Sequence, residues 1–153
     1  MSEENGVVSW IHYALTSTMP VQLCEVFFRE DDVLLLYYGR HTLVTMAMKI
    51  PKRIAKRMRI AISVEGLKRA REIADEERVL KYEEIEEVIL FGGSRKKDAR
   101  KIPLFALRPR ITIKTKKGKI YAFGIHDEEF DYERVKEELE ELARRKGFKI
   151  TVK

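Results

Sequence analysis

The side chains of this chain that are best suited to chemistry are few and scattered. Its histidines and its single cysteine are His12, His41, His126 and Cys24. His126 is followed directly by the three acidic residues 127–129, a combination that could hold a metal ion or support acid–base catalysis. Neighbouring residues at the start of a helix point in different directions, however, whereas metal ligands must converge. We therefore expect these carboxylates to cap a helix, and we predict no metal, cofactor or catalytic residue.

Cys24 lies within an apolar run, which is typical of a small buried hydrophobic residue. A single cysteine excludes an intramolecular disulfide and a cysteine-based zinc site. Its neighbours include neither the cationic groups nor the glycines that activate a nucleophilic thiol. An enzyme is accordingly the least favoured of three function classes, behind a protein-binding module and a nucleic-acid-binding protein.

Glycine amides and basic side chains come together at FGGSRKK, residues 91–97. This segment lacks the spacing and the final Lys-Ser/Thr of a phosphate-binding loop. A flexible connection between strands is the expected structure, although such a loop could hold an anion weakly.

The positive charge is concentrated in two zones, 49–59 and 95–119. Residues 40–64 contain seven basic and no acidic side chains, and residues 92–126 contain eleven basic and one acidic. An anionic partner should be sought there, unless these cations mainly form surface ion pairs with the abundant Glu. The candidate contacts are Lys52, Arg53, Lys56, Arg57, Arg95, Lys96, Lys97, Arg100 and Lys101.

Short apolar runs separated by turn residues predict an antiparallel meander in the first third of the chain. The run Val33–Tyr38 is almost wholly apolar, which indicates a central strand buried on both faces. The other strands expected here are Val7–Leu15 at an edge, Gln22–Arg29 and Thr42–Lys49.

The middle of the chain mixes helical and strand periodicity. Pro51–Met58 is expected to be a short basic helix or a basic loop, and Arg59–Val64 a strand with three aliphatic residues on one side. Gly66–Glu77 has helical spacing, and Val79–Phe91 has the pattern of a strand that ends at two glycines.

The last third is the best specified. After a basic loop and a short strand at Ile102–Leu107, a hairpin is predicted from Arg110–Thr115 and Lys119–Ile125, with Gly118 at its turn. A final helix follows, capped by Asp127 or Asp131 and ended by Gly147. Acidic residues crowd its start and basic residues its end, as the helix dipole favours. Its apolar stripe is Tyr132, Val135, Leu139, Leu142 and Ala143.

Three stretches carry a resemblance to a known family: YEEIEEVIL (Tyr82–Leu90), ITIKTKKGKIYAFGI (Ile111–Ile125) and DYERVKEELEELARRKG (Asp131–Gly147). They resemble the pleckstrin-homology-like superfamily, above all its prokaryotic PH and GRAM-like members. The resemblance implies an α+β fold, mainly antiparallel: a split barrel of about seven strands capped by a C-terminal helix. The helical segments expected at Pro51–Met58 and Gly66–Glu77 depart from that pattern and would be one or two short inserted helices.

The resemblance does not extend to phosphoinositide binding. Members that bind phosphoinositides carry Lys and Arg in the first hairpin loop. Here the first convincing hairpin turn is the acidic segment 30–32, which would repel a phosphorylated head group.

Composition indicates one globular domain over residues 1–153, with a flexible start at 1–6. Charged residues make up 37%, and Asn5 and Gln22 are the only side-chain amides, which is typical of a hyperthermophile, here expected to be archaeal. No apolar run is long enough to span a membrane, and the acidic start is unlike a signal peptide, so a cytoplasmic location is expected.

The leading functional hypothesis is a non-enzymatic binding or scaffolding module. It would recognise a protein partner at a sheet edge or in the groove beside the final helix. The alternative is a nucleic-acid-binding protein that uses the zones 49–59 and 95–119. The oligomeric state is not predicted.

Overall fold

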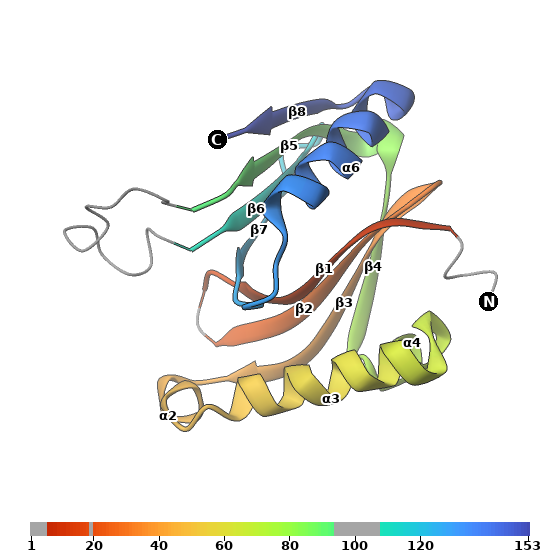
Figure 1. Ribbon diagram of the computed structural model, residues 1–153. Coiled ribbons are helices and arrows are strands. Elements are labelled where there is room, and N and C mark those ends of the chain that lie inside the picture. The colour runs from red at the N-terminus through yellow and green to blue at the C-terminus, as the bar shows by residue number, and fades with distance from the viewer. Residues whose placement is uncertain (1–5, 19, 94–107) are drawn as a thin grey trace.

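The computed structural model describes residues 6–18, 20–93 and 108–153, and within them the chain forms one sheet with helices on two sides (Figure 1). A 3₁₀ turn, Tyr82–Glu84, lies between the fourth and fifth strands. The elements are β1 (Val7–Thr16), β2 (Val21–Arg29), β3 (Asp32–His41), α2 (Leu43–Ala47), α3 (Ile50–Glu65), α4 (Leu67–Ile73), β4 (Glu76–Lys81), β5 (Ile85–Phe91), β6 (Arg110–Thr115), β7 (Ile120–Ile125), α6 (Tyr132–Lys146) and β8 (Lys149–Val152).

The strand order among the described residues is β4-β3-β2-β1-β7-β6-β5-β8. Every neighbouring pair is antiparallel except β5 and β8, which run parallel. The prediction of an α+β fold with a mainly antiparallel sheet is therefore confirmed. The described sheet has eight strands, compared with the about seven that the resemblance implies. One of them, β8, follows α6, where no strand was predicted. The sheet does not close, since β4 and β8 remain as edges.

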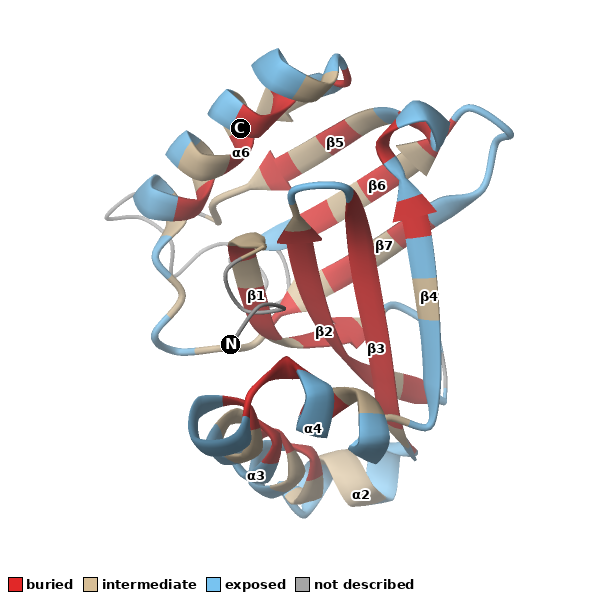
Figure 2. Cartoon of the chain, turned by 90° about the vertical axis from the view of Figure 1, so that its right-hand side faces the viewer, coloured by how far each residue is buried: buried red, intermediate tan, exposed pale blue. Residues whose placement is uncertain are grey.

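The sheet bends so that its two halves enclose a core (Figure 1). Val33 and Leu35 of β3 face this core together with residues of β5, β6 and β7 and the apolar stripe of α6. Leu34 and Leu36 point the opposite way, into a second core covered by α3 and α4 (Figure 2). Strand β3 is thus buried on both faces, as predicted.

Helix α6 confirms the features predicted for it. The side chain of Asp131 accepts a hydrogen bond from the backbone N–H of Arg134 at 3.2 Å, and Gly147 ends the helix in the left-handed conformation at φ 82°. Phe148 then packs its ring on that of Tyr82, with 5.6 Å between the ring centroids. The residues of α6 that are fully buried are Val135, Leu139, Leu142 and Ala143.

Residues 42–65 differ most from the prediction. The strands expected at Thr42–Lys49 and Arg59–Val64 are wrong. The first segment forms α2 with its cap residues, and the second lies within α3. The buried face of α3 repeats at helical spacing through Pro51, Ala55, Met58 and Ile62. An isoleucine two residues before Ile62 and a valine two residues after it produced an accidental period of two.

Three further predictions differ from the structure. Strand β1 is not an edge, because it pairs with both β2 and β7. The helix expected over Gly66–Glu77 ends at Ile73, and the single strand expected over Val79–Phe91 is split by the 3₁₀ turn into β4 and β5. The strand expected at Ile102–Leu107 lies outside the described residues. Among the described helices, none is long and apolar enough to cross a membrane.

Candidate functional site

Helix α3 divides its basic residues between two stripes. Successive residues of an α-helix are about 100° apart, so positions three, four or seven apart share a side. One stripe lies directly opposite the buried face and is formed by Arg53, Arg57, Ile60 and Val64. A second lies along one flank and is formed by Lys52, Lys56 and Arg59. The first basic zone is therefore one helix with two differently directed cationic surfaces.

The outer stripe, Arg53, Arg57, Ile60 and Val64, is exposed and chemically mixed. Neither arginine forms an ion pair with any described residue. The two aliphatic side chains beyond them are 54% and 76% exposed. Two arginines without an ion pair to a described residue and two exposed aliphatic side chains therefore occupy one continuous strip.

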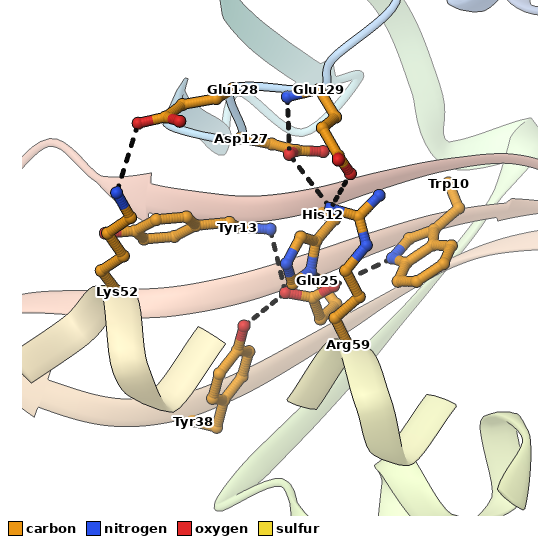
Figure 3. Close-up of polar contacts among 10 residues, drawn as sticks. All are labelled: Trp10, His12, Tyr13, Glu25, Tyr38, Lys52, Arg59, Asp127, Glu128 and Glu129. Carbon is orange, nitrogen blue, oxygen red and sulfur yellow. Dashed lines mark hydrogen bonds and ion pairs between the residues drawn. The ribbon is translucent and has the colours of Figure 1, made fainter. Parts of the chain in front are cut away.

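The flanking stripe forms one wall of a pocket of about 410 Å³. Residues 12 and 13 of β1 form the second wall, and the loop of residues 126–129, between β7 and α6, forms the third. Figure 3 shows how the side chains of these three segments approach one another. We call this site the α3 pocket.

A bulge in β1 builds the second wall. The register with β2 shifts between Ile11 and Ala14, and Tyr13 takes a positive φ of 55°. A left-handed conformation costs a non-glycine residue about 1–2 kcal/mol, and such strain collects at functional sites. Here the bulge lets the Tyr13 N–H donate to Glu25 Oε2 at 3.0 Å, while the Tyr13 carbonyl accepts from the His126 N–H at 2.9 Å.

Glu25 lies beneath the pocket and has no exposed surface. Its Oε1 atom accepts from Trp10 Nε1 at 2.9 Å and lies 2.6 Å from His12 Nδ1, and its Oε2 atom also accepts from the Tyr38 hydroxyl (Figure 3). The indole N–H of Trp10, the backbone N–H of Tyr13 and the hydroxyl of Tyr38 each donate to this carboxyl group. His12, whose Nδ1 atom contacts Glu25, also lines the pocket.

The phenol groups near Glu25 stay protonated. Burial raises the pKa of Tyr38 strongly, and the negative charge of Glu25 raises it further. Burial also raises the pKa of Tyr13. Both hydroxyls are therefore hydrogen-bond donors at any physiological pH.

Ion pairs join α3 to the loop. Arg59 pairs with Glu129 at 2.7 Å and with Asp127 at 3.4 Å, and Lys52 pairs with Glu128 at 3.4 Å. Lys56 forms no ion pair with a described residue. Of the two caps predicted for the helix, Asp131 is confirmed, and the capping role predicted for the loop carboxylates 127–129 is wrong. The helix cap is at residue 131, and Asp127 instead accepts the N–H of Glu129 at 3.0 Å.

His126 at the pocket is neutral at pH 7. Burial lowers its pKa from 6.5 to about 4, and the positive charge of Arg108 contributes to this shift. Its ring lies 5.7 Å from that of Tyr13, which itself lies 6.2 Å from that of His12, measured between ring centroids. Within the described ranges, no three His, Cys, Asp or Glu side chains gather closely enough to hold a metal ion.

The second basic zone is described only in part. Its candidate contacts Arg95, Lys96, Lys97, Arg100 and Lys101 lie outside the described residues. At the β6–β7 turn, Lys116 and Lys117 line a different pocket, which they share with Glu83 and Glu84. The α3 pocket and this turn are separate sites.

Sequence reasoning found the basic residues of α3 but missed the Glu25 network and the bulge. One signal was present: Glu25 is a single carboxylate inside the otherwise apolar stretch LCEVFF, residues 23–28. A buried carboxylate needs partners, and histidine, tryptophan and tyrosine on the neighbouring strands were available to provide them.

The sequence matches no protein-family model and no curated protein. Two solved structures are similar in part. One is the C-terminal domain of an unknown protein from Leishmania infantum, with a TM-score of 0.45, 10% identity, and coverage of 95% of this chain and 88% of that one. The other is the hSac2 domain from human phosphoinositide phosphatase Sac2, with a TM-score of 0.46, 9% identity, and coverage of 95% and 74%. Neither likeness supports an inference about function.

Proposed function

We propose that this chain is a non-enzymatic binding module that takes an acidic, amphipathic segment of a protein partner on the outer stripe of α3. One observation carries the proposal: Arg53 and Arg57, without ion pairs to described residues, continue along the same stripe into the exposed Ile60 and Val64. An amphipathic partner helix presents a matching strip, with carboxylates beside aliphatic side chains.

The exposed aliphatic groups favour protein over nucleic acid. Fully burying an isoleucine or a valine against a partner stabilises the complex by about 1.5–3 kcal/mol. A phosphate backbone offers no apolar surface to cover them. Nucleic acid remains the second candidate, because Arg53, Lys56 and Arg57 are exposed cations that no described carboxylate neutralises.

The architecture that we propose for this module is a pleckstrin-homology-like split barrel, in which α2, α3 and α4 are an insertion between β3 and β4. The bent sheet with α6 packed into its core supports this assignment. The two arginines beside the acidic turn after β2 are already paired with its carboxylates: Arg145 with Glu30 at 2.8 Å and Arg29 with Asp32 at 2.6 Å. This turn is therefore poorly suited to bind a phosphoinositide. We therefore place the binding surface on the inserted helix α3.

Fluorescence anisotropy with two labelled probes tests the proposal. One probe is a designed amphipathic helix of Leu and Glu, and the other is a single-stranded RNA of similar charge. Two double variants are compared: Arg53→Ser with Arg57→Ser, and Ile60→Ser with Val64→Ser. Arg144→Ser serves as the control, because Arg144 is an exposed cation on α6 that forms no ion pair with a described residue.

The proposal expects the peptide to bind and both double variants to weaken it by roughly tenfold or more, with no effect of the control. If the RNA binds, and only the arginine double variant weakens that binding, the proposal of protein binding is replaced by the nucleic-acid function. If Arg144→Ser weakens peptide binding as much as the double variants do, the outer stripe is not a specific binding surface.

A further inference from the structure

The α3 pocket lies on the flank of α3, away from the outer stripe, and the proposed protein binding does not use it. Its volume of about 410 Å³ lies in the range of small-ligand sites, roughly 300–1,000 Å³. Three separate parts of the chain converge on it: α3, the bulge of β1 and the loop of residues 126–129.

The floor of the pocket is rigid and preorganised. The two oxygens of Glu25 each receive two hydrogen bonds, which fix the ring of His12 and the backbone of Tyr13. The loop is tied to the same bulge by the hydrogen bond from the His126 N–H to the Tyr13 carbonyl. Binding groups held by fixed neighbours lose little entropy when a ligand arrives.

Three rings gather along one side of the pocket. The ring of Tyr13 neighbours those of His12 and His126, at 6.2 Å and 5.7 Å between centroids and with tilts of 54° and 39°, and all three residues line the pocket. A planar ring can stack on the phenol face of Tyr13 or on the neutral imidazole face of His126, and the hydroxyl and ring nitrogens of these side chains can bond to its polar edge.

The opposite wall offers a place for one anionic group. Lys56 has no ion pair with a described residue, and Lys52 is held only by Glu128, in a pair whose side chains are 62% and 83% exposed. A pair so exposed contributes little to stability, so an incoming anion can displace it. Arg59, in contrast, is occupied by two carboxylates.

The loop carboxylates limit the charge of the ligand. Asp127, Glu128 and Glu129 line the same pocket and would repel a second or third phosphate. The same oxygens can accept hydrogen bonds from hydroxyl or amino groups of a ligand. The site therefore favours one phosphate, a planar ring and hydroxyl groups between them.

We propose that the α3 pocket binds a nucleoside monophosphate. Its phosphate would lie at Lys56 and Lys52, its sugar hydroxyls at Glu128, and its base against the rings of Tyr13 and His126. This site is distinct from the outer stripe and would exist whether or not the stripe binds a protein.

The chain contains an intrinsic fluorescence probe near the pocket. Trp10 is its only tryptophan; it donates to Glu25 and lies 5.6 Å from the His12 ring, so its fluorescence senses the pocket floor. AMP and CMP are titrated into the full chain, with adenosine, inorganic phosphate and ATP as comparison ligands, and calorimetry checks each affinity. We expect a monophosphate to bind at least roughly tenfold more tightly than any comparison ligand.

Two variants and a control locate the binding. Lys56→Ser removes, from an exposed helix position, a cation that has no ion pair with a described residue. Tyr13→Gly removes the ring at a positive φ that glycine adopts without strain. Each variant should weaken the binding of the monophosphate by roughly tenfold or more. Lys68 is an exposed lysine on α4, and Lys68→Ser should leave this affinity unchanged. Lack of binding at millimolar AMP and CMP, equal binding of inorganic phosphate alone, or no effect of Lys56→Ser would overturn the proposal.

Discussion

Nδ1 of His12 lies 2.6 Å from Oε1 of Glu25, whose side chain has no contact with solvent. Placing a charge there would cost several kcal/mol if it were unpaired. Hydrogen bonds from Trp10, Tyr13 and Tyr38 give the carboxyl group three further partners. The network joins β1, β2 and β3 at the place where the bulge interrupts the regular ladder.

Glu25→Ala is expected to lower the free energy of unfolding by about 3–5 kcal/mol, because it leaves buried donors without an acceptor. Chemical denaturation measures the loss, and the emission of Trp10 should change in the folded state. Glu86→Ala, at an exposed position of β5, is the control and should change stability by no more than about 0.5 kcal/mol. Equal effects of the two variants would show that the network is not required for stability.

The strain at Tyr13 can be measured by comparing two substitutions that both remove its ring. Tyr13→Gly should be more stable than Tyr13→Ala by about 1 kcal/mol, because only glycine is relaxed at φ 55°. Thermal or urea unfolding of both variants provides the comparison. An alanine variant as stable as the glycine variant would mean that the bulge relaxes when the ring is lost.

His126 makes stability depend on pH in a defined window. Its pKa is about 4 in the folded chain and 6.5 for a free side chain, so between these values the unfolded state binds more protons. Stability is therefore complete above about pH 6.5 and falls as the pH approaches 4. The same direction holds for His41, whose pKa is also lowered by burial.

The variant His126→Gln isolates this contribution. We expect its melting temperature to fall less than that of the parent between about pH 6.5 and 4.5. Carboxylates with lowered pKa values, such as Glu77, contribute only below this window. If the melting temperatures of the two proteins fall equally over this pH range, His126 is not buried and neutral in the folded chain.

The sequence predicts best the parts whose signals are local. The β6–β7 hairpin and α6 were recognised from Gly118, Asp131 and Gly147, whose conformations depend on their immediate neighbours. The basic residues of α3 were found because charge is visible in composition. The mixed character of the outer stripe could not be predicted, because the helix was expected to end at Met58 and would then contain neither Ile60 nor Val64.

The pocket could not be predicted because it depends on contacts between distant segments. Glu25 and His12 are 13 residues apart, and Arg59 and Asp127 are 68 apart. The register shift that brings Tyr13 to Glu25 has no marker in the sequence, since the position of positive φ is occupied by tyrosine and not by glycine. An isolated carboxylate in an apolar strand is the feature that should prompt a search for buried partners.

A matched pair of isoleucines tests the helix that replaced the predicted strand. Ile60 is 54% exposed and Ile62 is 7% exposed, although they are two residues apart. In α3, Ile62→Ala should lower the free energy of unfolding by about 2–5 kcal/mol, and Ile60→Ala should change it by less than about 0.5 kcal/mol. A strand over residues 59–64 would place both side chains on one face. Urea denaturation of the two variants therefore distinguishes these structures, and similar losses in both would mean that the outer stripe of α3 is not exposed and could not bind a partner.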